Sequence, residues 1–232
     1  MTTCVVMQPT YLPWSGYFNL MAEADVFVLL DDVQFNRNSW QSRNRILSQG
    51  TELMLSVPVR VEHLDTRIQD VRLAPGPWRR KHLTSIREAY GKAAHGPDLI
   101  DMLRPIYESD RPPELLTDWN QQIITVLAKA LGISTAVVRA SALGCDGARS
   151  AHVLNICTAL SCDEYLSPRG SAEYLAEDAF ERNGRVALRF QSYVPVPYTQ
   201  RKVSAFVSHL SVVDVIAHQG LEFARRYIRS SL

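Results

Sequence analysis

The chain has 232 residues, enough for one sizeable hydrophobic core or two small ones, and its 46% hydrophobic content is ordinary for a globular protein. Lys and Arg number 25 against 24 for Asp and Glu, so the chain lacks the broad positive charge that nucleic-acid binding favours. We therefore expect one domain over residues 1–232 and no nucleic-acid partner.

The N-terminal part predicts a strand, a loop, a helix and a second strand. The apolar run CVVMQP ends in a Pro-containing loop, and GYFNLMAEA follows with apolar residues at helical spacing. The segment DVFVLLDDVQF is rich in β-branched and aromatic residues, as are strands buried in a parallel sheet. Residues 51–73 predict two further short strands, and Pro58 restricts the first of them to a sheet edge.

The sequence predicts a helical section from about residue 76 to residue 131. In PWRRKHLTSIREAYGKA, large side chains spaced by four residues form one stripe. The stripe consists of Trp78, His82, Ile86 and Tyr90. A second helix is expected after Pro97, and a third from about Pro113 to Leu131.

Strand and helix patterns alternate in the rest of the chain. The expected strands are ISTAVVRAS, DEYLS and RVALRFQSY, and the helices between them are ARSAHVLNICTALS and SAEYLAEDAFERNG. A last helix starts near Ser211, with Asp214 in its first turn. The alternation predicts an α/β fold with a mainly parallel, Rossmann-like sheet and helices on both faces. Two glycines and an Asp make residues 144–149 the candidate for a mobile loop.

The cysteines and the first residues indicate the compartment. The four cysteines have no C-x-x-C spacing, which predicts reduced thiols and no metal site. They are Cys4, Cys145, Cys157 and Cys162. The start MTTCVVMQP lacks a basic region before a long apolar stretch, and no window approaches the roughly 18 apolar residues of a membrane helix. The expectation is a soluble, cytoplasmic protein without a membrane partner.

The loop QPTYLPWSGYF is the first candidate site, because ligands of open α/β sheets bind at the carboxyl ends of strands. Gln8 and Tyr11 are candidates to hydrogen-bond a ligand, and Trp14 and Tyr17 to stack on it. Gly16 would begin a helix whose N-terminal amides favour an anion. The alternative is that these aromatic side chains fill the core beneath the loop.

A second candidate site is the polar segment LDDVQFNRNSWQSRNRI, which follows the next predicted strand. Adjacent aspartates can supply a base or bind a cation, and arginines bind carboxylate or phosphate through their planar forks. Neighbouring strand residues point in opposite directions, so at most one of Asp31 and Asp32 is expected to enter the site. The other candidates are Gln34, Asn38, Arg43, Asn44 and Arg45. A solvated loop capped by its own Asn and Asp residues is the alternative.

A third candidate site is the turn in YLSPRGSAEYL, between a predicted strand and a predicted helix. Ser167, Arg169 and Gly170 there present a hydroxyl and backbone amides that suit an anionic group, although an ordinary helix N-cap explains them equally. His209, just before the last helix, is a candidate acid or base near neutral pH, or a structural histidine. The chain has no Gly-x-Ser-x-Gly, Walker, His-Glu-x-x-His or Gly-x-Gly-x-x-Gly motif.

At these residues the chain resembles the WbqC-like family, a group of bacterial proteins often encoded among genes for surface-polysaccharide or specialised-metabolite assembly. The resemblance covers essentially the full chain and implies a biosynthetic context. The segments that carry it are QPTYLPWSGYF, DDVQFNRNSWQSRNRI, LSVPV, KHLTSIREAY, YLSPRGSAEYL and HLSVVDVIAHQG.

A further similarity is to nucleotidyltransferases and pantoate-type ligases of the HUP-like Rossmann group, which carry Pro-Thr and then His-x-Gly-His. The corresponding four residues here are Trp14, Ser15, Gly16 and Tyr17. The glycine remains, but both histidines that would stabilise a transferring phosphate are absent. The similarity is one of fold, and fold does not by itself establish function.

Three functions follow as hypotheses. The first is a group transferase that moves an acyl or aminoacyl unit to an amine or hydroxyl of a small intermediate, which is carrier-bound or nucleotide-linked. Tyr11, Asp32 and His209 would handle protons, and catalysis would rest on positioning and electrostatics. The second is a nucleotidyltransferase or ligase with an altered HUP-like site. The third is a non-catalytic protein that binds a sugar or a carrier-linked intermediate. The sequence names no cofactor and leaves the oligomeric state open.

Overall fold

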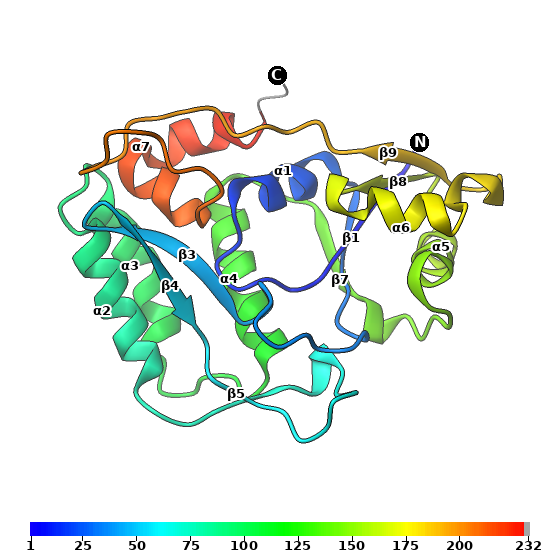
Figure 1. Ribbon diagram of the computed structural model, residues 1–232, viewed down its shortest axis with the longest axis horizontal. Helices are drawn as coiled ribbons and strands as arrows, with labels where there is room; N and C mark the ends of the chain where they lie inside the picture. The colour runs from blue at the N-terminus through cyan, green and yellow to red at the C-terminus, as the bar shows by residue number, and fades with distance from the viewer. Residues whose placement is uncertain (230–232) are drawn as a thin grey trace.

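In the computed structural model, which describes residues 1–229, five parallel strands form a sheet at the centre of the fold (Figure 1). They are β1 (Thr3–Met7), β2 (Val26–Leu29), β7 (Ala136–Arg139), β8 (Glu164–Ser167) and β9 (Ala187–Phe190). Their order in the sheet is β7-β2-β1-β8-β9. In chain order, β1, β2 and β7 follow one another toward one edge of the sheet, and β8 and β9 then extend it from β1 toward the other edge. This is the strand order of a Rossmann fold. The predicted α/β, Rossmann-like fold is confirmed.

Helices cover both faces of this sheet, because its strand residues alternate between two apolar clusters. Val5, Phe27 and Leu29 pack in the larger cluster, which includes side chains of α1 (Ser15–Glu23) and α4 (Leu116–Ala130). Cys4, Val6 and Val28 face the smaller cluster, with side chains of α5 and α6. These two helices span Arg149–Ala159 and Ala172–Glu177. In Figure 1, α4 lies to the left of the sheet, and α5 and α6 lie to its right.

The helical section lies on the side of the larger cluster. It contains α2 (Trp78–Tyr90), α3 (Gly96–Tyr107) and α4, and the last helix α7 (Val212–Tyr227) packs beside them. The whole predicted stripe on α2 is buried, as its spacing by four residues requires. Ser211 caps α7 by accepting a hydrogen bond from the backbone N of Val213. The predicted bounds of these helices are therefore confirmed to within a few residues.

A β-hairpin begins inside the polar segment of the second candidate site. Strand β3 (Arg43–Ser48) pairs antiparallel with β4 (Thr51–Ser56), and the sequence predicted only the second of these. The two turn residues, Gln49 and Gly50, have φ of 52° and 84°, which is the backbone of a tight hairpin turn. The sequence predicted no strand over residues 43–48, because alternating polar residues on a half-buried strand look like a solvated segment.

Smaller elements complete the described chain. Strands β5 (Val59–Arg60) and β6 (Arg72–Leu73) form a second small antiparallel pair. Short 3-10 turns span Ile68–Asp70, Ala140–Ala142, Arg169–Ser171 and Phe180–Asn183. The helix expected from SAEYLAEDAFERNG is shorter than predicted, because α6 ends at Glu177 and Ala179 takes a positive φ. No helix within residues 1–229 is both long and apolar enough to span a membrane.

Candidate functional site

The loop QPTYLPWSGYF follows β1, which borders the point where the strand order of the sheet reverses. Two buried Asn side chains hold its backbone. Asn44 on β3 donates to the carbonyl oxygens of Tyr11 and Leu12 at 3.0 and 2.9 Å. Asn120 on α4 donates to the carbonyl of Pro9 at 3.0 Å. The loop is therefore fixed by side chains from elements that are distant in sequence.

Trp14 lies at the end of this loop, against the first turn of α1. A Cβ on Gly16 would lie 2.1 Å from the indole Cζ2, so the ring occupies space that only glycine leaves free. The imidazole of His209 stacks on the indole, with ring centroids 4.8 Å apart and an angle of 30° between the planes. Tyr193 meets the indole edge-on at 5.8 Å. The aromatic ring of Trp14 is thus held in one orientation.

Trp14 and His209 line a cavity of about 370 Å³, which we call the aromatic cavity. Its lining residues are Met7, Thr10, Trp14, Tyr17, Trp40, Asn44, Arg45 and His209. The carboxyl end of β1, the start of α1, strand β3 and the segment before α7 each contribute to it. Five of the predicted site residues therefore meet here, and they come from three separate segments of the sequence.

Arg45 supplies the positive charge of the aromatic cavity. Its guanidinium lies 5.5 Å from the ring centroid of Trp40, and its Nη1 pairs with Glu52 at 2.9 Å. Its Nη2 donates to the carbonyl of His209 at 3.4 Å. The Nε atom is buried and has no hydrogen-bond partner among the described residues. Because Arg45 lines the cavity and its side chain is 27% exposed, its charged fork can meet an anionic group there.

Tyr17 and Gln8 contribute to this region through hydrogen bonds within the protein. The hydroxyl of Tyr17 donates to the carbonyl of Gln8 at 3.3 Å, and burial raises the pKa of that hydroxyl. The side-chain oxygen of Gln8 accepts from Gln41 at 2.9 Å. Asn44 is likewise fully used, because its oxygen accepts from the backbone N of Arg45 at 2.8 Å. These three side chains shape the cavity and support its walls.

Tyr11 does not join the aromatic cavity. It is fully buried, and its hydroxyl lies 2.8 Å from Nδ1 of His82 and 2.5 Å from the hydroxyl of Tyr107. Burial raises the pKa of Tyr11 well above its ordinary value, with added contributions from Tyr107. The hydroxyl therefore stays protonated and enclosed, in the position that the core-filling alternative describes.

The two aspartates after β2 face different surroundings, as the alternation of strand residues leads one to expect. The carboxylate of Asp31 is buried and accepts from the backbone N and the hydroxyl of Ser141, at 3.0 and 2.9 Å. Asp32 faces a cavity of about 640 Å³ and lies 3.1 Å from Nε2 of His152. The other ring nitrogen of His152 lies 3.3 Å from the carbonyl oxygen of Asp146. We call this second hollow the Asp32–His152 cavity.

The Asp32–His152 cavity is polar and is bordered by the glycine loop at residues 144–149. A Cβ on Gly147, whose φ is 111°, would lie 3.0 Å from the backbone N of His152, so this glycine lets the loop approach α5 closely. The half-buried thiol of Cys145 also lines the cavity. Burial raises its pKa, as do the nearby charges of Asp32 and Asp146, so it is not an activated nucleophile.

The remaining predicted residues lie apart from the aromatic cavity. Gln34 lines the Asp32–His152 cavity and donates to the carbonyl of Leu64 at 2.7 Å. Asn38 is exposed in a turn with φ of 62°. Arg43 lies half-buried on β3, and its Nε has no partner among the described residues.

The turn after β8 is likewise separate from the aromatic cavity. The hydroxyl of Ser167 is enclosed and donates to the carbonyl of Pro168 at 3.3 Å. Arg169 donates from Nε to the carbonyl of Gln191 at 2.9 Å, which ties this turn to the end of β9. Gly170 is exposed, with open space where a Cβ would stand. The helix after it, α6, has only six residues.

Sequence reasoning missed Trp40 and His152. Trp40 lies inside the quoted polar segment and is 48% exposed, so an isolated Trp among Asn, Ser and Arg was the available signal. His152 lies on a predicted helix far from Asp32 in sequence, and only the folding of α5 against the sheet brings the two together. Within residues 1–229 no group of three or more His, Cys, Asp and Glu side chains is arranged to hold a metal ion.

Comparison with known proteins identifies a family match over most of the chain. Residues 8–226 match the WbqC-like protein family. The uncharacterized protein Rv1507c of Mycobacterium tuberculosis is 28% identical over 233 aligned positions, which cover 99% of this chain and 98% of the relative. No solved structure matches the chain. The chain belongs to the WbqC-like protein family.

Proposed function

We propose that this protein is a biosynthetic group transferase whose small substrate binds in the aromatic cavity. The observation that carries the proposal is the stack of Trp14 and His209 beside the positively charged Arg45 in one cavity. Ligand pockets typically combine apolar and aromatic walls with a few polar groups, in volumes of about 300–1,000 Å³. The aromatic cavity, at about 370 Å³, has this composition and is within this range.

The side chains of the cavity suggest two parts of the substrate. A flat or ring-shaped part fits against the aromatic lining that Trp14, Trp40 and His209 provide together. In this lining, Gly16 and His209 fix the orientation of the Trp14 indole. A carboxylate or another anionic oxygen fits beside Arg45, since this residue lines the cavity and its guanidinium carries a positive charge. Both contacts position the substrate, which is how a transferase without a covalent intermediate lowers its barrier.

In the proposed reaction an acyl or aminoacyl unit passes from a thioester to an amine or hydroxyl. The acceptor nitrogen or oxygen bonds to the acyl carbon, and the bond from that carbon to the donor sulfur breaks. The proton of the acceptor passes by way of the ring of His209 to the departing thiolate, so atoms and charge balance. His209 is exposed and lines the cavity, and imidazole is the side chain that most often serves as general base and acid.

Asp32 is kept in the proposal as a second proton-handling residue, together with His152. Its carboxylate faces a separate polar cavity along the same edge of the sheet, so it would serve a part of the substrate outside the aromatic cavity. The enclosed hydroxyl of Tyr11 is left out of the mechanism, because it has no access to either cavity.

The family suggests where such a transferase works. The resemblance described above implies assembly of surface polysaccharide or of a specialised metabolite, and the proposed intermediate belongs to one of these routes. A cytoplasmic location fits the four free cysteines, because thiols stay reduced there.

The test is a transfer assay read by mass spectrometry. The folded protein is incubated with acyl and aminoacyl thioesters as donors and with amino sugars and amino acids as acceptors. The expected result is a product whose mass equals the acceptor plus the acyl unit. His209→Gln should lower kcat by about a hundredfold. His63→Gln removes an exposed imidazole that is not in the lining of the cavity, and it should leave kcat unchanged. If no donor class yields product, the transferase proposal fails.

A second candidate function is binding without catalysis. Besides Arg45 and Tyr17, the lining of the aromatic cavity contains one titratable side chain, His209. This small number of groups that could transfer a proton favours binding without catalysis. In that case Asp32→Asn and His209→Gln would both leave ligand binding and the output of the pathway nearly intact. A loss of output in either variant, with the fold and ligand binding preserved, would rule out the binding-only function.

A further inference from the structure

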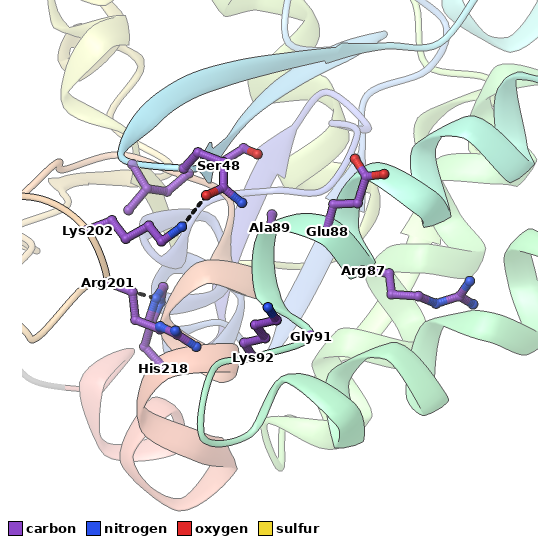
Figure 2. Close-up of a pocket in the computed structure, with 11 residues that line it drawn as sticks. Ser48, Arg87, Glu88, Ala89, Gly91, Lys92, Arg201, Lys202 and His218 are labelled. Atoms are coloured by element: carbon purple, nitrogen blue, oxygen red, sulfur yellow. Dashed lines mark hydrogen bonds between the residues drawn. The ribbon is translucent and has the colours of Figure 1, made fainter.

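A third cavity, of about 530 Å³, lies between the end of α2, the β3–β4 hairpin, residues 201–202 of the segment before α7, and α7 itself. We call it the basic cavity. Its lining residues are Leu47, Ser48, Gln49, Arg87, Glu88, Ala89, Gly91, Lys92, Arg201, Lys202 and His218. Figure 2 shows Lys92, Arg201, Lys202 and His218 gathered on one side, while the side chain of Arg87 extends away from them. Two segments that are distant in sequence thus bring cations to one hollow.

The positive charge of this cavity is not neutralised within the protein. Among the described residues that line the basic cavity, Glu88 is the one acidic residue. Among residues 1–229, none of Lys92, Arg201 and Lys202 takes part in an ion pair with a carboxylate. Lys202 donates to the side-chain oxygen of Gln49 across the cavity, as the dashed line in Figure 2 shows. Cations that share a hollow repel one another unless an anion lies between them.

The turn that carries Arg201 and Lys202 is firmly built. The buried side chain of Gln200 accepts from the backbone N of Val207 at 2.8 Å and donates to Asp214 at 2.8 Å. The backbone N of Arg201 donates to Nε2 of His218 at 3.2 Å. These bonds fasten the turn to α7, so the two cations are presented from a fixed backbone.

The opposite wall fits closely against the same turn. Lys202 has a φ of 62°, and a Cβ on Gly50 would lie 2.4 Å from its carbonyl oxygen. Such a positive φ is costly for a lysine and persists only where the surroundings hold it. Gly50 therefore lets the β3–β4 turn approach Lys202.

The helix dipole of α2 explains only part of the positive charge in the basic cavity. Cations near a helix C-terminus are favourable, and this accounts for Arg87 and Lys92. Arg201 and Lys202 lie on a separate turn and have no such role. Their convergence with Lys92 is what an anion-binding site requires, since lysine and arginine donors from several directions suit a group with many oxygens.

We infer that the basic cavity binds the diphosphate group of a small ligand, through Lys92, Arg201 and Lys202. The chemistry is shared by two sources, a nucleoside diphosphate and a coenzyme A-type pantetheine carrier. The inference rests on the basic cavity alone and does not depend on the proposed use of the aromatic cavity.

The experiment uses the full chain and inorganic pyrophosphate as its probe, followed by isothermal titration calorimetry. The expected result is saturable binding to one site with a Kd below about 1 mM at low salt, weakening as the ionic strength rises. The variant Lys92→Gln/Arg201→Gln/Lys202→Gln should bind at least about tenfold more weakly. Because Lys202 lies in a strained turn, Lys92→Gln alone is a second variant, expected to weaken binding about threefold.

The control is Arg80→Gln/Lys81→Gln, which removes two exposed cations from the other end of α2. It should bind pyrophosphate like the unaltered protein. The inference is overturned if the unaltered protein shows no saturable binding, or if the control weakens binding as much as the triple variant does. Titrations with ADP and with coenzyme A then distinguish the two sources by which binds more tightly. Because pyrophosphate has neither an acyl group nor a ring, failure here leaves the transferase proposal standing.

Discussion

Tyr11 and Trp14 come from the same loop, three positions apart, and have opposite surroundings. Tyr11 is enclosed with His82 and Tyr107 beneath the loop, whereas Trp14 forms a wall of the aromatic cavity. Between them Leu12 takes a φ of 43°, which turns the chain. The comparison teaches that the loop has two tasks: one aromatic side chain anchors it to the helical section and another is presented to a ligand. Changes to the first should affect stability, and changes to the second should affect binding.

The largest expected effect is on the free energy of unfolding at acid pH, and it arises from His82, the buried partner of Tyr11. Burial lowers the pKa of His82 to about 4, against an opposing contribution from the Ser56 backbone. Between pH 6.5, the ordinary pKa of histidine, and pH 4, His82 is protonated in the unfolded chain but largely neutral in the folded protein. The free energy of unfolding therefore falls by up to about 3 kcal/mol as the pH drops from 6.5 to 4. Urea unfolding at a series of pH values measures this loss. His82→Gln should flatten it, and equal slopes in both proteins would contradict the assignment.

Tyr11→Phe is expected to lower the free energy of unfolding by about 2 kcal/mol, because His82 and Tyr107 are left without their buried partner. Ligand binding and transfer should remain unchanged at temperatures where the variant is folded. Urea unfolding and the transfer assay test the two halves of this prediction. A variant of normal stability and reduced transfer would give Tyr11 the role in proton handling that the sequence predicted.

Trp14→Leu keeps apolar bulk and removes the flat ring, so it should raise KM about tenfold, or about 1.4 kcal/mol. Trp14→Phe should restore most of the loss, since a ring again faces the ligand. Steady-state transfer kinetics give the comparison. If Trp14→Leu lowers only the unfolding free energy and leaves KM unchanged, the indole is a packing residue like Tyr11.

Gly16→Ala should have the smallest effect, a rise in KM of about threefold, because the new methyl group pushes the indole of Trp14 out of place. Gly170→Ala is the matched control, since a Cβ there meets open space. The same kinetic assay applies to both. Equal effects of the two substitutions would show that the orientation of the indole does not matter.

Much of the fold could be predicted because helices and buried strands carry strong local patterns. The stripe on α2 and the alternation of strands and helices after residue 131 led to the parallel sheet that the structure contains. Strand β3 was missed, because its polar residues at Arg43 and Asn44 look like a solvated loop until β4 and the core are present. Local sequence does not record which side of a strand will be covered.

The candidate site could be predicted only in part, for a related reason. Trp14 could be predicted because its loop follows a parallel strand. Arg45 and His209 could be predicted because arginine binds anions and histidine can transfer protons. Neither could separate Tyr11 from Trp14, since both are aromatic side chains with a polar atom. The pairing of Asp32 with His152 depends on the packing of α5. Tertiary contacts, more than residue type, decide which polar side chain is left without a partner.

The most direct test of the proposed function is a structure of the protein with the product of the transfer assay bound. The account predicts the product in the aromatic cavity, with a flat part against its aromatic lining and an anionic oxygen within hydrogen-bond distance of the guanidinium of Arg45. A product bound in the Asp32–His152 cavity, with the aromatic cavity left empty, would contradict it.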